Sequence, residues 1–180
     1  VGKGMGGGSI TIIPQGVKNI GAYHVAGNAL LYGATGGQLF ISGTVGQRFG
    51  VRNSGAIGVV EGCSAHGAEY MTGGTLVVLG NIGFNFAAGM TGGKVFVLST
   101  QKNFKQYISE TAPEQRQITD LDILDLKVLI ETHYEKTNSH VAEKLLENEK
   151  KWSEIFSVFG GVTTFEGTPN LKLENIKALD

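Results

Sequence analysis

The chain has 180 residues, 41% of them hydrophobic, and a formal net charge of −1. The balanced charge argues against a basic nucleic-acid or membrane-surface binder, and the one cysteine excludes an internal disulfide framework and a multi-thiolate zinc site. No apolar run approaches the roughly 20 residues that a membrane helix needs. We therefore expect neither nucleic acid nor a membrane as a partner.

The distribution of glycine divides the chain into two parts. Residues 1–100 hold 25 of the 28 glycines but only 7 of the 31 charged residues. Residues 101–180 hold the other 24 charged residues and 3 glycines. The sequence therefore predicts a domain boundary near residue 100.

A repeat runs through the first part. A Thr or Ser followed by Gly recurs at intervals of 19, 18 and 19 residues, and a second glycine often follows seven positions later. These structural corner glycines are Gly36, Gly43, Gly55, Gly62, Gly73, Gly80 and Gly92. Because glycine adopts positive φ without steric cost, we expect them to form the corners of a coil. A short apolar segment, such as Phe49 and Val51, precedes each corner.

Apolar residues spaced two apart follow the corners. The clearest are Leu39, Ile41, Leu76, Val78, Val95 and Val97. This spacing puts both members of a pair on one face of a strand, and recurrence about every 19 residues is typical of a parallel β-helix. We predict a mainly β fold, with a right-handed parallel β-helix over residues 1–99 and these six side chains inside. An antiparallel sandwich is less favoured, because Asn-Gly and Asp-Gly hairpin signals are missing from the corners.

The second part has a helical pattern. Leu126, Leu129 and Ile130 lie at helical spacing, and Thr119 or Asp120 can cap the helix that contains them. After Thr137-Asn138-Ser139, a second apolar stripe begins. We predict a linker over 100–118, a helical hairpin over 119–159 that packs on the β-helix, and a tail over 160–180. The two helices are expected near 121–134 and 140–157.

Several strings in the chain resemble a known family. They are LYGATGG at 31–37, RFGVRNSGA at 48–56, VVEG at 59–62, EYMTGG at 69–74 and AAGMTGG at 87–93. They resemble the C-terminal GXGXG domain of the glutamate synthase large subunit, and the resemblance extends over residues 1–158. Residues 1–4 resemble a stretch inside that domain, so we expect the chain to begin a little after the natural domain start.

The resemblance implies a structural function. Glutamate synthases make two glutamates from glutamine and 2-oxoglutarate with reduced ferredoxin or a nicotinamide, and in that family the catalytic thiol, the FMN and the iron–sulfur cluster belong to other domains. The expected role is a non-catalytic scaffold that positions the amidotransferase and FMN-binding domains, with no catalytic, cofactor or metal residue of its own. The compartment would be the cytoplasm or a plastid. The alternative is a free-standing accessory β-helix subunit, resembling the one in formylmethanofuran dehydrogenase.

A third reading is an enzyme that uses Cys63 and His66. They are three residues apart, so a thiolate–imidazole pair is conceivable, but a buried thiol and a surface histidine are the favoured interpretation. Arg48 and Arg52 could grip a carboxylate; a salt bridge to Glu61 or Glu69, or contact with another domain, is favoured.

Three further features have structural interpretations. Residues 2–7 match G-x-G-x-x-G, but a strand-like segment follows where a dinucleotide loop needs a helix, so we predict a turn. Tyr23 and His24 carry no clear assignment, while His133 and Tyr134 are expected to pack on the apolar face of the first helix. The low charge of residues 1–100 predicts a surface that faces other domains, or self-association into a homo-oligomer.

Overall fold

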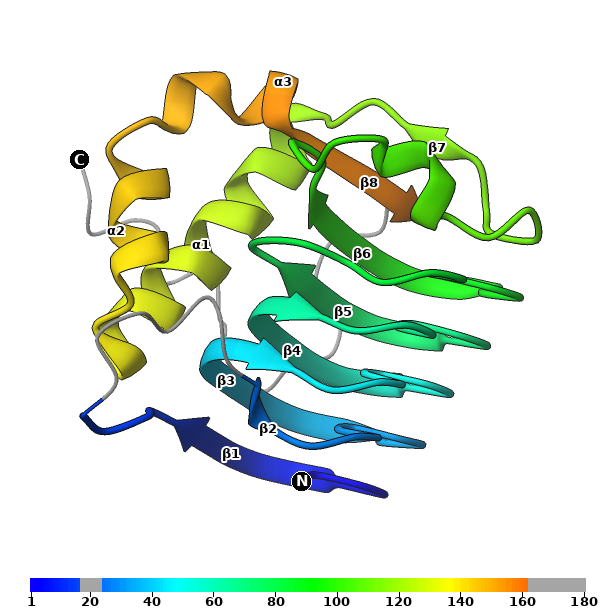
Figure 1. The fold of residues 1–180 in the computed structure, drawn as a ribbon, viewed down its shortest axis with the longest axis horizontal. Coiled ribbons are helices and arrows are strands. Elements are labelled where there is room, and N and C mark those ends of the chain that lie inside the picture. The colour runs from blue at the N-terminus through cyan, green and yellow to red at the C-terminus, as the bar shows by residue number, and fades with distance from the viewer. Residues whose placement is uncertain (17–23, 162–180) are drawn as a thin grey trace.

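A parallel sheet organises the molecule. The computed structural model describes residues 1–16 and 24–161 (Figure 1). The parallel strands are β1 (Gly6–Ile12), β2 (His24–Ala26), β3 (Gly36–Val45), β4 (Ser54–Cys63), β5 (Thr72–Val78) and β6 (Gly92–Leu98). They lie in the order β1-β3-β4-β5-β6, with β2 paired to β3. Each strand therefore stacks on the equivalent strand of the previous repeat, which confirms the mainly β solenoid; the hand of the coil stays a prediction.

The register stacks equivalent residues inside the coil. Leu76 of β5 pairs with Gly58 of β4 on one side and with Val95 of β6 on the other. Two residues further along β5, Val78 pairs with Val97 of β6. The six side chains predicted to point inward are all fully buried and belong to one hydrophobic cluster. The period-two pattern therefore identified the interior face correctly.

The short segments before the corners are stacked turns, so each repeat contributes one strand to the sheet. Backbone φ is positive at every second residue there, as at Arg48 and Arg52, with φ of 63° and 55°. Backbone hydrogen bonds still join successive turns, for example from Gly50 N to Leu30 O at 2.8 Å. The turns keep Leu30 and Phe49 in the solenoid interior without extended backbone.

Close approach of neighbouring turns explains many of the corner glycines. A Cβ at Gly73 would lie 2.2 Å from Ser54 O, and one at Gly55 would lie 2.2 Å from Thr35 O. Neither glycine has positive φ, which differs from the expectation; of the seven, positive φ occurs at Gly43 and Gly62. The corners therefore need glycine mainly because the stacked backbones leave no room for a side chain.

The second part begins with short elements and ends with a strand. Its elements are a 3-10 helix η2 (Phe104–Tyr107), β7 (Gln115–Arg116), α1 (Asp120–Thr137), α2 (His140–Leu146), a 3-10 helix η3 (Glu149–Lys151), α3 (Trp152–Ile155) and β8 (Phe156–Gly160). The helix expected over 140–157 is therefore broken, and its end is strand. β8 pairs antiparallel with β6 and with β7, so residues expected to form a linker and a helix close the end of the sheet. Most of the predicted tail, 162–180, lies outside the described residues.

The sheet has an apolar core on each face. Leu76 and Val78 face the solenoid interior, while Val77 lies in a second cluster with Leu129 and Trp152. Figure 1 shows α1 and α2 on one side of the stacked strands. The helices therefore bury their apolar side against the sheet, as the sequence predicted.

Candidate functional site

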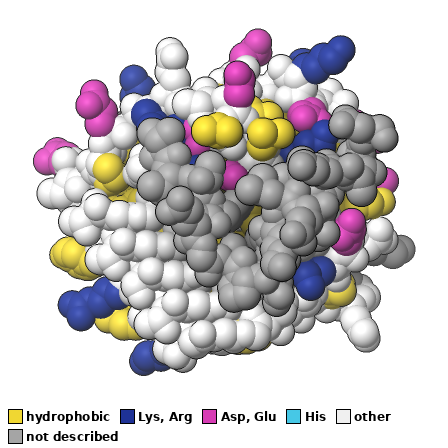
Figure 2. Space-filling view, turned by 180° about the vertical axis from the view of Figure 1, so that it is seen from behind, with side chains coloured by type: hydrophobic (Ala, Val, Ile, Leu, Met, Phe, Trp, Pro, Cys, Tyr) yellow, Lys and Arg dark blue, Asp and Glu magenta, His cyan; other side chains and the backbone are white. Residues whose placement is uncertain are grey.

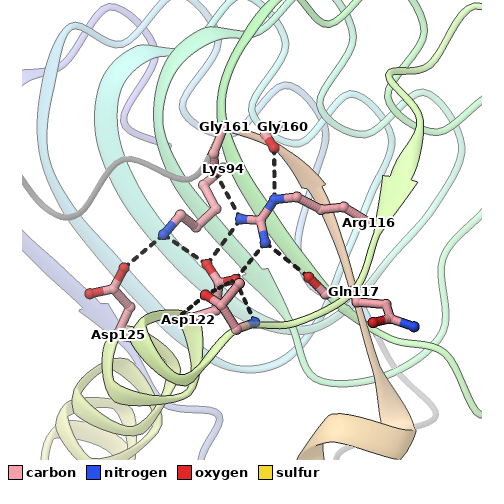
Figure 3. A network of polar contacts seen from close by, with 8 residues as sticks. Lys94, Arg116, Gln117, Asp122, Asp125, Gly160 and Gly161 are labelled. Atoms are coloured by element: carbon pink, nitrogen blue, oxygen red, sulfur yellow. Dashed lines mark hydrogen bonds and ion pairs between the residues drawn. The ribbon is translucent and has the colours of Figure 1, made fainter.

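A buried network of charges joins α1 to the end of the sheet (Figure 3). Lys94 Nζ lies 3.0 Å from Asp122 Oδ1 and 2.8 Å from Asp125 Oδ2, and the Lys94 side chain is only 4% exposed. Arg116 from β7 also pairs with Asp122 and donates to the carbonyl of Gly160 at the end of β8. The network therefore ties β6, β7, β8 and the first turns of α1 together.

Local sequence positions Asp122 for this role. Thr119 caps α1 and forms a capping box with Asp122, so the carboxylate is held by backbone as well as by the two cations. Burial alone would raise the pKa of Asp122, but hydrogen bonds from Arg116, Thr119 and Lys94 outweigh it and hold the pKa well below its usual range. Burial raises the pKa of Asp125, although Lys94 opposes the shift. The pKa values of these two neighbouring carboxylates are therefore shifted in opposite directions.

Lys94, Asp122 and Asp125 were not identified from the sequence. The available signal was the spacing of the two aspartates, which are three residues apart and so share a helix face, next to the buried Leu126 and Leu129. Lys94 lies at the start of the apolar run that includes Val95. A charge beside each of two apolar stripes that must pack together indicates a buried ion pair.

A second buried polar cluster lies where α1 and α2 meet β4. Glu61 Oε1 accepts hydrogen bonds from Ser42 of β3 and from Ser139, the N-cap of α2. His133 Nε2 lies 3.5 Å from the same oxygen, and the His133 ring stacks on Phe40. His133 is fully buried, as the helical pattern predicted, and Tyr134 is partly buried against the same core. Glu61 therefore anchors the junction of the helices and does not pair with an arginine.

Cys63 and His66 have separate surroundings. Burial raises the pKa of the Cys63 thiol to about 12, so the sulfur stays protonated at neutral pH. His66 Nδ1 instead lies 2.7 Å from Glu69 Oε1, which also accepts from Asn85. These contacts favour the structural interpretation over a nucleophile–base pair.

Arg48 and Arg52 are exposed, and within residues 1–16 and 24–161 neither forms an ion pair. The predicted salt bridge to Glu61 or Glu69 is therefore wrong, because Glu61 is buried under the helices and Glu69 bonds to His66 and Asn85. The alternative expectation, that Arg48 and Arg52 contact another domain, stays a prediction.

The glycine-rich start forms a turn that leads into β1, as expected. Gly2 and Gly4 both have φ of 66°, and the strand begins at Gly6 with no helix N-terminus to hold a phosphate. His24 contacts Thr44 and Ser64 side chains at 3.3 Å, while Tyr23 lies outside the described residues. In the part of the chain that the structure describes, no cluster of three metal-ligating side chains occurs and no helix is long and apolar enough to cross a membrane.

Comparison with known proteins establishes the family. The model of the GXGXG motif family matches residues 1–163, a range that includes every described residue. The chain belongs to the GXGXG family. Its GXGXG solenoid is also similar to glutamate synthases of several kinds, which confirms the resemblance found in the sequence.

Three glutamate synthases illustrate the similarity. The ferredoxin-dependent glutamate synthase of Pyropia yezoensis is 48% identical over 162 residues, which cover 88% of this chain and 10% of the relative. Glutamate synthase [NADH] of Schizosaccharomyces pombe is 47% identical over 149 residues, covering 81% of this chain and 7% of the relative. Glutamate synthase [NADPH] large chain of Bacillus subtilis is 40% identical over 168 residues, covering 88% and 10%. The GXGXG chain thus spans about a tenth of the length of these relatives.

Proposed function

We propose that this chain is a structural domain of a glutamate synthase, which positions an amidotransferase domain and an FMN-binding domain and performs no chemical step itself. The observation that carries the proposal is the match over most of the chain to enzymes about ten times longer. Because the similarity includes ferredoxin-, NADH- and NADPH-dependent enzymes, the proposed role is independent of the electron donor.

The placement of the ionisable groups supports this role. The solenoid has two acidic residues, Glu61 and Glu69, and both are held by neighbouring side chains. Lys94 is neutralised by buried aspartates. These groups hold the structure together, so they are not available as a general acid and base.

The chain's residues also do not fit the cofactors that the family implies. An iron–sulfur cluster needs several thiolates, whereas the one cysteine is buried and its thiol pKa is raised to about 12. The glycines of residues 2–7 lead into a strand, so they do not offer a flavin phosphate the N-terminus of a helix. We therefore place FMN and the iron–sulfur cluster in other domains of the parent enzyme.

The test compares the isolated chain with the parent enzyme. We expect the isolated chain to show no flavin absorbance and to convert neither glutamine nor 2-oxoglutarate. In the parent enzyme, Leu76→Asp should disrupt the solenoid and reduce glutamine-dependent glutamate formation, while Thr11→Asp on the exposed side of β1 should not. Turnover by the isolated chain, or full activity of the Leu76→Asp enzyme with an unfolded solenoid, would disprove the structural role.

A further inference from the structure

The outer side of the stacked turns carries four large side chains at backbone positions that favour glycine. Arg48, Arg52, His66 and Tyr70 have φ of 63°, 55°, 68° and 53°. Both arginines are exposed, Tyr70 is 56% exposed and the His66 side chain is 39% exposed. We call these four residues the turn face.

The backbone ladder brings the four residues together. Arg48 N donates to Ala65 O at 3.0 Å, and Arg52 N donates to Glu69 O at 2.8 Å. These bonds place Arg48 beside His66, and Arg52 beside Tyr70, on neighbouring turns. The turn face therefore consists of two pairs of side chains, each of which spans two neighbouring repeats.

The fold itself does not require these side chains. Gly33 and Gly89 occupy the positions equivalent to Arg52 and Tyr70 in the flanking turns, with φ of 64° and 62°. A left-handed conformation is strained for a non-glycine residue, and such strain tends to persist where function retains the residue. Within residues 1–16 and 24–161 the arginines form no ion pair, so no salt bridge in this part of the chain compensates the strain.

The charge of the turn face indicates what it contacts. Glu61 is buried beneath the helices, and Glu69 is held by His66 and Asn85, so the solenoid offers no further carboxylate to the two arginines. Figure 2 shows acidic side chains mainly in the upper half of the view, where basic side chains also lie, and basic and hydrophobic side chains at the lower left edge. A complementary surface would be acidic.

We propose that the turn face docks on an acidic surface of the same parent polypeptide, outside residues 1–180. The proposal rests on the proposed function, because relatives about ten times longer supply the partner surface. The arginines would pair with carboxylates through their planar guanidinium groups, and Tyr70 would add aromatic contact area. The turn face thereby gives the scaffold a defined orientation relative to its neighbour.

Oxidative footprinting of the parent enzyme and of the isolated chain tests this contact. His66 and Tyr70 should be oxidised several-fold more slowly in the parent enzyme than in the isolated chain. Equal rates at both residues would overturn the docking proposal. If protection then appeared elsewhere in the chain, the structural function would stand without it; if no residue of the chain were protected, the structural function would fall as well.

Charge variants test the acidic partner. In the parent enzyme, Arg48→Glu with Arg52→Glu should raise the oxidation of His66 and Tyr70 to the rate of the isolated chain. Arg48→Gly with Arg52→Gly should have the same effect there, yet raise the melting temperature of the isolated chain because the strain is relieved. Loss of protection in the parent enzyme together with a higher melting temperature of the isolated chain would show that the arginines serve docking and not the stability of the fold. Unchanged protection in either double variant would overturn the proposal.

Two controls match these variants. Ala29→Gly relieves the same kind of strain, at φ 59°, without removing a charge, so protection should remain. Lys144→Glu reverses an exposed charge on α2 and should also leave protection intact. Loss of protection in the Lys144 variant equal to that of the arginine variants would show a general charge effect and contradict a specific contact.

Discussion

Lys94 Nζ lies 2.8 Å from Asp125 Oδ2, and this buried ion pair joins the last parallel strand of the solenoid to the helix that covers it. Asp122 lies on the other side of the same ammonium group, at 3.0 Å. Lys94 and Arg116, which also pairs with Asp122, together balance the two buried carboxylates. Such an arrangement contributes little over an apolar contact while it is complete, but it is costly when one member is lost.

Lys94→Met should destabilise the protein by about 3–5 kcal/mol, because it leaves Asp125 buried without a cation and Asp122 with Arg116 only. Unfolding by urea, followed by circular dichroism, measures the change. Lys127→Met is the matched control: Lys127 pairs with Glu149 on the surface and should cost less than about 1 kcal/mol. Equal losses in the two variants would contradict the buried role of Lys94.

Asp122 should give the stability a characteristic dependence on acid. Its pKa is lower in the folded state than the ordinary value of 3.8, so its contribution is present above that value and is lost as the pH falls below it. We expect the stability difference between the wild type and Asp122→Asn to shrink below about pH 4. Denaturant unfolding at a series of pH values measures this trend.

Asp125 provides the opposite trend in the same experiment. Its pKa is raised, so its contribution is largest at low pH and decreases as the pH rises through the folded pKa. The difference between the wild type and Asp125→Asn should therefore grow as the pH falls. Parallel trends for the two variants would show that the carboxylates do not titrate as the geometry implies.

Leu76→Asp should destabilise the protein by several kcal/mol, because it buries a carboxylate without a partner in the solenoid interior. Thr11→Asp places the same group on the exposed side of β1 and should change stability by less than about 0.5 kcal/mol. Thermal unfolding compares them. A Leu76→Asp protein that melts like the wild type would contradict the inward assignment.

The sequence predicted the elements whose side chains repeat, because stacking makes each repeat bury the same face. The spacing of Leu76, Val78 and the equivalent residues therefore indicated which face of each strand lies in the solenoid interior. The stacked turns were missed because Arg48 and Arg52 have no local preference for positive φ; the hydrogen bonds to neighbouring turns impose it. These bonds join residues about 18 positions apart, beyond the reach of local propensity.

Tertiary pairing also overrode the helical pattern at the end of the described chain. Residues 156–160 were expected to begin within a helix, yet they form β8 because the edge of β6 offers backbone partners. The Lys94 network could be inferred only after the contact between β6 and α1 was known. The low charge of residues 1–100 predicts that part of the solenoid surface faces other domains, and this stays a prediction.

Cys63 should be unreactive in the folded protein. Its thiol is buried and its pKa is raised to about 12, so the thiolate that reacts with disulfide reagents is scarce at neutral pH. We expect one equivalent of thiol to react with an aromatic disulfide reagent only after denaturation. Rapid reaction of the native protein at neutral pH would contradict the burial and reopen the catalytic reading of Cys63.

Gly73→Ala should destabilise the protein by about 1–3 kcal/mol or more, because its Cβ would lie 2.2 Å from the backbone oxygen of Ser54. Gly7→Ala is the matched control, since a Cβ there meets no atom within 4 Å and the backbone φ is not positive. Calorimetric melting temperatures compare the two. Tolerance of alanine at Gly73 would mean that the turns can separate more easily than the stacked backbones suggest.

Because α1 contacts the stack at two levels, the length of this helix limits how many turns can lie between the two contacts. Near its start α1 is paired with Lys94 on β6, and near its end His133 Nε2 lies 3.5 Å from Glu61 Oε1 on β4. Adding a repeat between these strands would move the anchors apart by about 4.8 Å, and a helix of fixed rise cannot lengthen to follow. A solenoid can in principle gain or lose whole turns, but a change in their number between β4 and β6 would break one of the two contacts of the covering helix.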